Sequence, residues 1–262
     1  MSSAIEVRDV WKRFTRAGRT VDALQSISLA VAPRQFVAVL GPSGCGKSTL
    51  LNMVAGFDRP TSGTLLVNGA PIDGPSPRRG VVFQEPALFP WYTVLENATF
   101  GPRQQGRHPR DYVPMAEQYI EQVGLKGFAG HYPAELSGGM KQRVGLARVL
   151  IMQPEILLMD EPFGALDAQT RSLMQELLLT VWERHRQTVL FITHDIEEAL
   201  LLADTIHVMT ARPGRVKESL QIAFPRPRSL DLTGSPAFNE VKRYIRDLMR
   251  DEAIKAEHAI MG

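Results

Sequence analysis

The fold is decided by Phe36-Val37-Ala38-Val39-Leu40 and the loop that follows it, Gly41-Pro42-Ser43-Gly44-Cys45-Gly46-Lys47-Ser48-Thr49. The apolar run predicts a buried strand, and the loop fills every fixed position of the pattern G-x-x-x-x-G-K-[ST]. Its glycines let the backbone curl, so that successive N–H groups face one concavity at the start of a helix through Leu50, Leu51 and Val54. The stretch therefore predicts a phosphate-binding loop, the P-loop, between a strand and a helix.

The side chains of the P-loop suit a nucleoside triphosphate bound with Mg²⁺. Lys47 would reach the β- and γ-phosphates as a mobile point charge, and the Ser48 hydroxyl would ligate Mg²⁺. Cys45 is the single cysteine of the chain, and the helix N-terminus and the nearby ammonium favour its thiolate. We therefore expect an alkylating reagent to modify Cys45 in the empty protein, and bound nucleotide to protect it.

Composition limits the class of protein. The 262 residues, with 44% apolar content, suffice for one large α/β domain, and a formal net charge of +2 gives no general drive toward nucleic acid. A single cysteine cannot form an internal disulfide, which is typical of a reducing compartment. Residues 1–20 lack the apolar core of a signal peptide, and no apolar run approaches the roughly 18 residues of a membrane span. We expect a soluble chain.

Two further apolar strands each end in residues suited to phosphoryl transfer. Ile156–Met159 leads into Asp160 and Glu161, and Val189–Thr193 leads into His194. Because ligands bind at the carboxyl ends of strands in open α/β sheets, we expect Asp160 to hold Mg²⁺ and Glu161 to position or deprotonate the attacking water. His194 can hydrogen-bond the γ-phosphate or hold Glu161, although taken alone it is typical of a solvent-facing loop.

Gln84 and Ser137-Gly138-Gly139 are further candidates for contact with the nucleotide. Gln84 follows the short apolar strand Val81–Phe83, where its side chain can touch Mg²⁺ or the attacking water, or can simply end the strand. Ser137-Gly138-Gly139 precedes the predicted helix Lys141–Leu150. Its hydroxyl and exposed N–H groups offer either a second phosphate site or an ordinary helix N-cap.

The sequence predicts a mainly helical insert over residues 88–150. Regular structure over residues 85–103 is opposed by three prolines, Pro86, Pro90 and Pro102. Within that segment Ala87–Trp91 gathers apolar side chains, which favours a patch for a partner over packing inside the domain. Helical spacing returns over Val113–Val123.

The two ends of the chain carry simpler patterns. Ile5–Val10 and Ser26–Val31 alternate apolar and polar residues, which predicts half-buried strands of an antiparallel sheet, and Asn68-Gly69 predicts a hairpin turn. Trp11–Thr20 is basic and is predicted to be a loop, in which Phe14 stacks on an adenine ring or packs in the core. Residues 237–260 have helical spacing, and this helix should pack on the core or on a second copy.

Together these residues resemble the ATP-binding cassette (ABC) family, and the resemblance covers nearly the whole chain. The P-loop matches the Walker A motif of the family, and Gln84 matches its Q-loop. Ile156–Asp160 with Glu161 matches the Walker B motif and catalytic base, and His194 matches the switch histidine.

The remaining motifs match with two departures. Leu136-Ser137-Gly138-Gly139-Met140 is similar to the signature motif, although Met140 stands where Gln is usual. Ala165-Leu166-Asp167 matches the D-loop, which implies a dimer contact at Asp167. Phe14 stands where the adenine-stacking residue of the family is more often Tyr.

The resemblance implies an α/β fold, a P-loop NTPase (RecA-like) core with an N-terminal antiparallel β subdomain and an inserted α-helical subdomain. Residues 1–262 would form a single ABC ATPase domain. Residues 1–87 and 151–224 would form the catalytic core with the β subdomain, residues 88–150 the helical signature subdomain, and residues 225–262 a C-terminal linker and helix. The implied cofactors are ATP and Mg²⁺, with Mg²⁺ held by Ser48, Gln84 and Asp160, and the implied catalytic residues are Glu161, His194 and Lys47.

Within the family, Gly80–Gln84, Leu88–Trp91, Pro162–Arg171 and Ala211–Val216 are similar to the ATPase subunits of bacterial nitrate, taurine and alkanesulfonate importers. That likeness implies an ATP-hydrolysing, energy-coupling subunit at the cytoplasmic face of the inner membrane, serving import of a small oxyanion or organosulfur compound. Its partners would be a second cassette, in a homodimer, and two permease subunits that meet a periplasmic or lipid-anchored substrate-binding protein. Each MgATP would lie between the P-loop of one cassette and the residues Ser137, Gly138, Gly139 and Met140 of the other.

Two other classes of protein also use a P-loop. A soluble P-loop switch or kinase would not need Leu136–Gly139, and the sequence lacks the guanine motif N-K-x-D. A chromatin or repair ATPase of the cassette type should show long heptads or a strongly basic surface, and the sequence has neither. The alternative that remains is a cassette ATPase or P-loop switch that is not coupled to transport.

Overall fold

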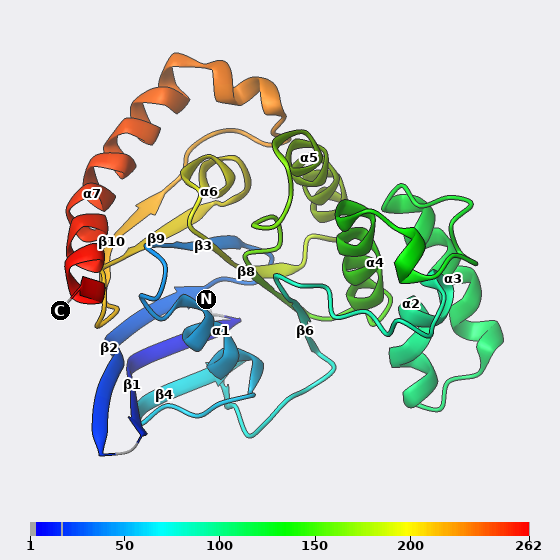
Figure 1. Cartoon of the computed structure of the whole chain (residues 1–262), viewed down its shortest axis with the longest axis horizontal. Coiled ribbons are helices and arrows are strands. Elements are labelled where there is room, and N and C mark those ends of the chain that lie inside the picture. Colours follow the sequence, from blue (N-terminus) through cyan, green and yellow to red (C-terminus); the bar gives the residue numbers. More distant parts are fainter. Residues whose placement is uncertain (1–3, 17, 262) are drawn as a thin grey trace. The chain divides into compact units, whose positions relative to one another are not determined.

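The computed structural model describes residues 4–16 and 18–261, without the side chains of Arg16 and residues 253–261. The chain divides into two compact units, Met1–Ser76 with Arg186–Gly262 and Pro77–His185 (Figure 1). The first unit contains the P-loop and His194. The second contains Gln84, the Ser137 motif and the Asp160-Glu161 pair. The predicted site residues are therefore distributed over both units.

An antiparallel sheet opens the first unit, with the strand order β2-β1-β4-β5 (blue to cyan in Figure 1). Its strands are β1 (Ile5–Arg16), β2 (Arg19–Val31), β4 (Ser62–Val67) and β5 (Ala70–Pro71). The predicted turn at Asn68-Gly69 is confirmed, since both residues have positive φ, 50° and 78°, between paired strands.

The predicted loop over Trp11–Thr20 is wrong, because β1 and β2 continue through most of it as paired strands. Phe14 pairs with Val21 in the register, and an ion pair of 2.6 Å joins Arg13 to Asp22 across the strands. These side chains are mostly exposed. The strands over Trp11–Thr20 are therefore stabilised by cross-strand pairing and not by burial, and for that reason the apolar pattern of the sequence did not reveal them.

Four strands of the first unit lie side by side around the P-loop, in the order β10-β9-β3-β8. They are β3 (Phe36–Leu40), β8 (Thr188–Thr193), β9 (Thr205–Met209) and β10 (Val216–Gln221). β3 pairs in parallel with both β8 and β9, and every residue of these three strands is buried, as continuous apolar runs predict. Helices α1 (Lys47–Ala55) and α6 (Ile196–Leu202) follow β3 and β8.

One ionisable side chain is buried in β9. His207 is 6% exposed, and its Nδ1 lies 2.7 Å from Ser219 Oγ on β10. Burial lowers the pKa of His207 to about 4. The imidazole is therefore neutral near pH 7, in a strand whose backbone pairs with Val39 of β3.

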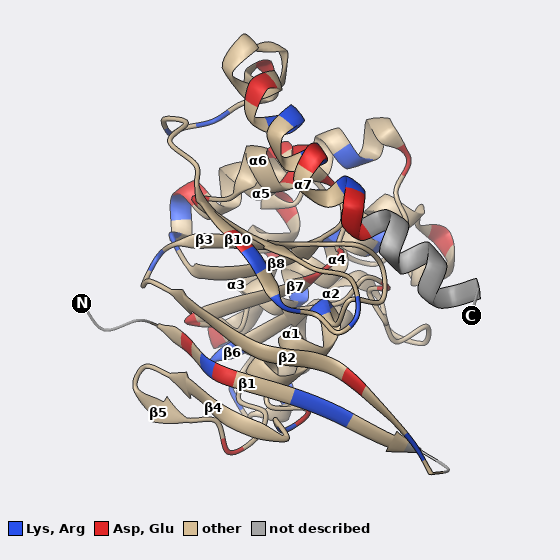
Figure 2. Cartoon of the chain, turned by 90° about the vertical axis from the view of Figure 1, so that its left-hand side faces the viewer, with Lys and Arg blue, Asp and Glu red and all other residues tan. Residues whose placement is uncertain are grey.

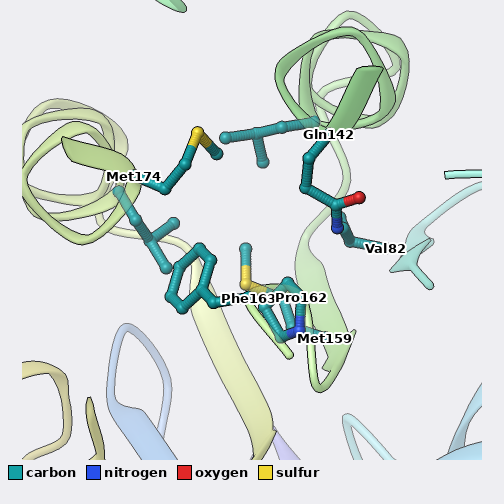
Figure 3. A pocket seen from close by; sticks show the side chains of 8 residues that line it. Val82, Gln142, Met159, Pro162, Phe163 and Met174 are labelled. Atoms are coloured by element: carbon teal, nitrogen blue, oxygen red, sulfur yellow. The ribbon is translucent and has the colours of Figure 1, made fainter. Parts of the chain in front are cut away.

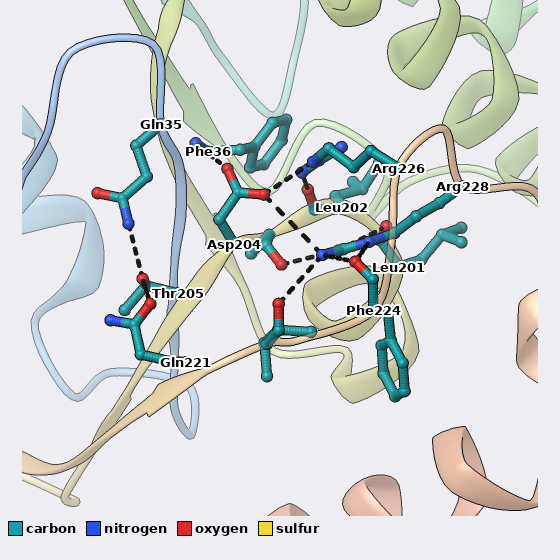
Figure 4. A network of polar contacts seen from close by, with 12 residues as sticks. Gln35, Phe36, Leu201, Leu202, Asp204, Thr205, Gln221, Phe224, Arg226 and Arg228 are labelled. Carbon is teal, nitrogen blue, oxygen red and sulfur yellow. Dashed lines mark hydrogen bonds and ion pairs between the residues drawn. The ribbon is translucent and has the colours of Figure 1, made fainter.

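The segment after β10 is bonded to the first unit by two arginines (Figure 4). Arg228 is buried and donates to carbonyls at the end of α6, those of Leu200, Leu201 and Ala203. Arg226 donates to Asp204 Oδ1 at 2.7 Å, and Asp204 also accepts from the amide of Phe36 at the start of β3. The predicted linker is thus tied to the sheet by charge-assisted hydrogen bonds.

A long helix ends the chain. After a short 3-10 turn, η2 (Leu230–Gly234), α7 (Pro236–Met261) buries Phe238 and Ile245 and contacts α6 and β9. Of the two arrangements expected for this helix, packing on its own chain is the one observed.

The second unit is mainly helical. Its helices are α2 (Val94–Gln104), α3 (Pro109–Gln122), the 3-10 turn η1 (Pro133–Glu135), α4 (Gly138–Leu150) and α5 (Ala168–His185). Its strands β6 (Arg79–Val82) and β7 (Ile156–Asp160) pair in parallel.

The expectation of irregular structure over residues 85–103 is wrong from residue 94 onward. A capping box starts α2: the Thr93 hydroxyl accepts from the Glu96 amide, and the Glu96 carboxylate accepts from the Thr93 amide. Pro102 lies in the last turn of α2, where its missing N–H removes a bond only near the helix end. A strong start signal therefore outweighs a proline close to the end.

None of the helices in the described part of the chain is both long and apolar enough to cross a membrane. Figure 2 shows basic and acidic residues interspersed, for example along β1 and β2. This mixture agrees with the formal net charge of +2.

Candidate nucleotide-binding site

The P-loop lies between β3 and α1, as predicted. Gly44 and Gly46 have φ of 75° and 101°, in the left-handed region that favours glycine. A Cβ added at Gly46 would lie 2.6 Å from Leu24 Cδ2 and 2.9 Å from Ala23 O, both on β2. Position 46 therefore needs glycine for conformation and for space, and the amides that follow open α1 toward an anion.

The Lys47 side chain is held over the P-loop. It is 4% exposed, and its ammonium donates to Gly41 O at 2.8 Å and to Pro42 O at 3.0 Å. Ser43, Gly44 and Ser48 are exposed, and Pro42, Gly46 and Thr49 are half-buried. A triphosphate on this loop would meet N–H groups, exposed hydroxyls and an ammonium that two carbonyls already position.

Cys45 points into the protein. It is 1% exposed, and its Sγ lies 3.0 Å from the position that a Cβ on Gly41 would take. Because Cys45 is buried, an alkylating reagent reaches its thiol only when the loop opens, and the modification expected in the empty protein stays a prediction. Cys45 contributes its backbone to the loop.

His194 follows the same edge of the sheet as the P-loop. β3 and β8 are parallel, and Leu40 lies opposite Thr193 in their register. The Thr193 hydroxyl donates to the buried Glu198 at 2.7 Å, and Asp195 caps α6. His194 is thus an exposed residue on a backbone that is fixed on both sides.

Asp160 ends β7, and Glu161 is the first residue beyond it. Both are half-buried, whereas the preceding residues of the strand are buried. Glu161 has φ of 42°, a left-handed conformation that is strained for a residue with a side chain. Among the described residues eight non-glycine positions have positive φ, so the backbone supports Glu161 as a candidate only together with its place directly after β7.

Gln84 lies past β6 in an exposed segment that α4 holds at both sides. From α4, Gln142 donates to Phe83 O at 3.1 Å, and Arg148 donates to the carbonyls of Pro86 and Ala87. The sequence pattern does not reveal the roles of Gln142 and Arg148, because their partners are backbone carbonyls, which no side-chain motif records.

Gln142 also lines a small cavity of the second unit (Figure 3). The other lining residues are apolar: Val82, Leu146, Met159, Pro162, Phe163, Met174 and Leu178. Figure 3 shows the Gln142 amide reaching from α4 toward Val82. Because the lining of the cavity is mostly apolar, the cavity is a packing defect and not a phosphate site.

Ser137 is the N-cap of α4, and its Oγ accepts from the Met140 amide at 3.3 Å. Ser137 and Gly138 are exposed, whereas Gly139 is buried, and a Cβ there would lie 2.3 Å from Thr170 Cγ2 on α5. Glycine at 139 therefore permits close approach of α4 and α5. The Ser137 hydroxyl and the first amides of α4 remain at the surface, where both capping and phosphate binding are open to them.

Asp167 caps α5. It accepts from the Thr170 amide at 3.0 Å and from the Thr170 hydroxyl at 2.6 Å, and these bonds hold the pKa of Asp167 below its usual range. Its carboxylate is exposed and ionised at a helix N-terminus, where negative charge is favourable. The dimer contact expected here stays a prediction.

Two aromatic candidates are exposed. Phe14 lies on β1 and is 45% exposed, with the Lys12 ammonium 4.8 Å from its ring centroid, so it is not a core residue. Its stacking on adenine stays a prediction. Trp91 is 66% exposed and contacts Phe89, whose ring centroid lies 4.6 Å from that of Phe100 on α2. Part of the predicted apolar patch is thus packed and part of it is free to meet solvent.

Comparison with known proteins places these motifs in a family. A family model described as ABC transporter matches residues 24–164. The chain belongs to the ABC transporter family. It is 42% identical to the nitrate import ATP-binding protein of Synechocystis sp. over 98% of both chains. It is 44% identical to the taurine import ATP-binding protein of Jannaschia sp., over 99% of this chain and 97% of that one.

A solved structure supports the same assignment. The dimeric structure of an ATP-binding cassette in a post-hydrolysis state, bound to ADP and Pi, matches with a TM-score of 0.75 at 30% identity, over 84% of this chain and 100% of that chain. The α/β cassette fold expected from the sequence is confirmed. So is the activity, because the ATP-binding subunits of ABC transporters are ATPases.

Proposed function

We propose that this ABC ATPase powers the import of a small oxyanion or organosulfur compound such as nitrate, taurine or an alkanesulfonate. The observation that carries the proposal is 42% and 44% identity, over nearly the whole length, to import subunits named for nitrate and for taurine. The likeness extends past the P-loop and through the C-terminal helix. A shared mechanism that couples ATP hydrolysis to import is the simplest reason for likeness over that length.

ATP hydrolysis would use the motif residues that the sequence singles out. The P-loop amides and Lys47 bind the β- and γ-phosphates, and Ser48, Gln84 and Asp160 supply the oxygen ligands that Mg²⁺ prefers. Glu161 positions or deprotonates the attacking water, and His194 holds the γ-phosphate or Glu161. Three features fit these roles: the exposed Ser48, the half-buried carboxylates at the end of β7, and the positive φ of Glu161.

Two copies would pair head to tail, so that Ser137, Gly138, Gly139 and Met140 of one copy meet the nucleotide on the P-loop of the other. The exposed start of α4 supports this role, because its hydroxyl and first amides lie at the surface. ATP bridging the two copies would close the dimer, and loss of the γ-phosphate would reopen it. Asp167 would lie at the same contact.

Two permease subunits, themselves served by a periplasmic or lipid-anchored substrate-binding protein, would receive this motion at the cytoplasmic face of the inner membrane. The exposed Trp91 and the aromatic rings around it suit a protein partner. Arg148 joins this segment to α4, the helix that Ser137 begins. Closure of the ATP site would therefore reach the permease through α4 and the segment after Gln84.

Glu161→Gln tests the catalytic assignment. An amide cannot accept the proton of water but keeps the size of the side chain, so turnover should fall about 100- to 10,000-fold while ATP binding persists. Phosphate release measures the first effect, and gel filtration with ATP should show a stabilised dimer. Glu155→Gln, an exposed carboxylate just before β7, is the control and should change neither. Hydrolysis at the wild-type rate in Glu161→Gln would overturn the assignment.

Reconstitution tests the transport assignment. The ATPase is combined in lipid vesicles with the permease and binding protein encoded by adjacent genes, and uptake of nitrate, taurine and an alkanesulfonate is measured with ATP inside. We expect ATP-dependent uptake of one of them and a matching rise in ATP hydrolysis. Intact hydrolysis that no permease alters would instead favour a cassette ATPase that is not coupled to transport.

A further inference from the structure

The turn between β9 and β10, residues 210–215 (the strap), lies against the P-loop. Arg212 donates from Nε and Nη2 to Gly44 O, at 3.2 and 3.1 Å. Gly214 lies so close to the loop that an added Cβ would be 2.1 Å from Cys45 O. The strap therefore contacts two successive carbonyl groups of the P-loop, although none of its residues belongs to a phosphate-binding motif.

Holding these carbonyls orients the amides that would face a phosphate. A peptide group is planar and trans, so the Cys45 N–H points opposite to the Gly44 carbonyl, and the Gly46 N–H points opposite to the Cys45 carbonyl. The bond from the Cys45 amide to Pro42 O is long, at 3.4 Å, and holds that peptide only weakly. Contact with the strap on the carbonyl side therefore sets the direction of two N–H groups of the anion-binding nest.

The strap is in turn held by the C-terminal helix α7. Glu252 on α7 is 2% exposed; its Oε2 accepts from the Ala211 amide at 3.0 Å, and its Oε1 lies 3.1 Å from Lys217 Nζ on β10. Lys217 also donates to Leu248 O, one turn earlier on α7. A buried carboxylate shared by an amide and an ammonium makes a firm anchor, because breaking either contact leaves a buried charge poorly compensated. The residue before Arg212 is thus fixed by α7.

We propose that Arg212 is a positioning residue for the P-loop and that Glu252 sets its place, so that α7 controls nucleotide affinity through the strap. Displacement of α7 would release Ala211, withdraw Arg212 from Gly44 O and loosen the two amides, without any contact between α7 and the nucleotide. The effect on nucleotide affinity rests on the proposed function, in which the P-loop is the nucleotide site. The loosening of the P-loop itself does not depend on that proposal.

Cys45 provides a reporter that needs no nucleotide, because it is the single cysteine of the chain and is buried beneath the loop that the strap holds. Its rate of modification by N-ethylmaleimide should rise about fivefold in Arg212→Ala and in Glu252→Ala, the effect of losing one net hydrogen bond. Arg215→Ala is the matched control: it removes an exposed arginine of the same strap that bonds the Gln25 side chain, and it should leave the rate unchanged. Glu252→Gln keeps an acceptor for the Ala211 amide but loses the ion pair with Lys217, so it should give a smaller rise than Glu252→Ala.

Nucleotide affinity is the second readout. The Kd for ATP should rise about three- to tenfold in Arg212→Ala and Glu252→Ala, with kcat at saturating ATP near the wild-type value, and Arg212→Lys, which retains a donor, should recover part of the affinity. Lys217→Ala loosens Glu252 without removing the buried carboxylate and should give a smaller rise, which keeps the test valid if Glu252→Ala does not fold.

The outcomes separate the parts of the proposal. An unchanged Cys45 rate in Arg212→Ala would show that the strap does not hold the P-loop. A raised rate in Arg212→Ala with wild-type rates in Glu252→Ala and Lys217→Ala would overturn the link to α7. Because Cys45 is labelled without nucleotide, either failure is distinguishable from a failure of the proposed ATPase mechanism.

Discussion

The chain has two loops that end at helix N-termini and suit an anion, and they are built differently. The P-loop before α1 is packed into its own unit: Lys47 and Cys45 are buried, Gly46 has no room for a side chain, and Arg212 holds Gly44 from outside. At the start of α4, Ser137 and Gly138 are exposed, and the hydroxyl of Ser137 is engaged by a long bond of 3.3 Å from Met140.

This difference has a physical reason. A loop that binds phosphate by itself gains affinity when its amides are oriented in advance, so neighbouring segments press against it. A loop that completes a site on another copy must keep its donors at the surface until that copy arrives. If the start of α4 completes a site on another copy, packing around the helix N-terminus distinguishes the two kinds of loop, and substitutions in them should have different signatures.

Of the substitutions in the two loops, the largest effect is expected in the exposed one. Ser137→Arg fills the space that a phosphate from a second copy needs, so turnover should fall about 100- to 1,000-fold, as when preorganised donors are removed from a transition state. The Kd of the monomer for ATP should stay unchanged, because the P-loop is intact. Turnover is measured by phosphate release and Kd by a fluorescent ATP analogue. A raised Kd in Ser137→Arg would break the comparison, since the exposed loop would then contribute to binding by a single copy.

Lys47→Ala should show the opposite signature. It removes the ammonium from the P-loop, so the Kd for ATP should rise about 10- to 100-fold, the effect of losing hydrogen bonds from a charged donor. Binding is measured as for Ser137→Arg, and circular dichroism checks that the fold persists. Wild-type affinity in Lys47→Ala would contradict the placement of the triphosphate on this loop.

The P-loop and its strands could be predicted because continuous apolar runs bounded by glycine and acidic residues carry strong local signals. β3 begins and ends at the predicted residues, Phe36 and Leu40. The strands over Trp11–Thr20 and the helix from Val94 were missed, since cross-strand pairing and a capping box compete with charge and proline signals.

The supports of the site could not be predicted, because their partners are far away in sequence or are backbone atoms. Arg212 bonds a carbonyl 168 residues away, and Glu252 bonds an amide 41 residues away. The burial of Cys45 depends on how the loop turns over Gly41, and the sequence pattern does not contain that information. Motifs specified the chemistry of the site, whereas long-range contacts specify its geometry.

Protonation of His207 on β9 should lower, at acid pH, the free energy of unfolding of the unit that contains the P-loop. The pKa of His207 is about 4 in the fold and about 6.5 in an unfolded chain, so the unfolded state binds more protons between these values. Stability is therefore full above pH 6.5 and falls as the pH drops toward 4, by about 2 kcal/mol at pH 5. His207→Asn, which keeps a polar partner for Ser219, should reduce this loss in urea unfolding at pH 5 and 7.5. An equal pH dependence in both proteins would show that other groups dominate.

The smallest effect is expected at Met140, which stands in the exposed loop where the family usually has Gln. Met140 is half-buried, and its backbone amide, not its thioether, bonds Ser137 Oγ. If backbone donors and the Ser137 hydroxyl carry the phosphate contact, Met140→Gln should change turnover less than about tenfold, roughly 1.4 kcal/mol of barrier. The Kd for ATP should stay the same as in the wild type. It is measured with the same fluorescent ATP analogue as for Ser137→Arg. A much larger loss of turnover would mean that the thioether packs against a specific surface of the second copy, so that side-chain packing as well as exposed amides would define this half of the site.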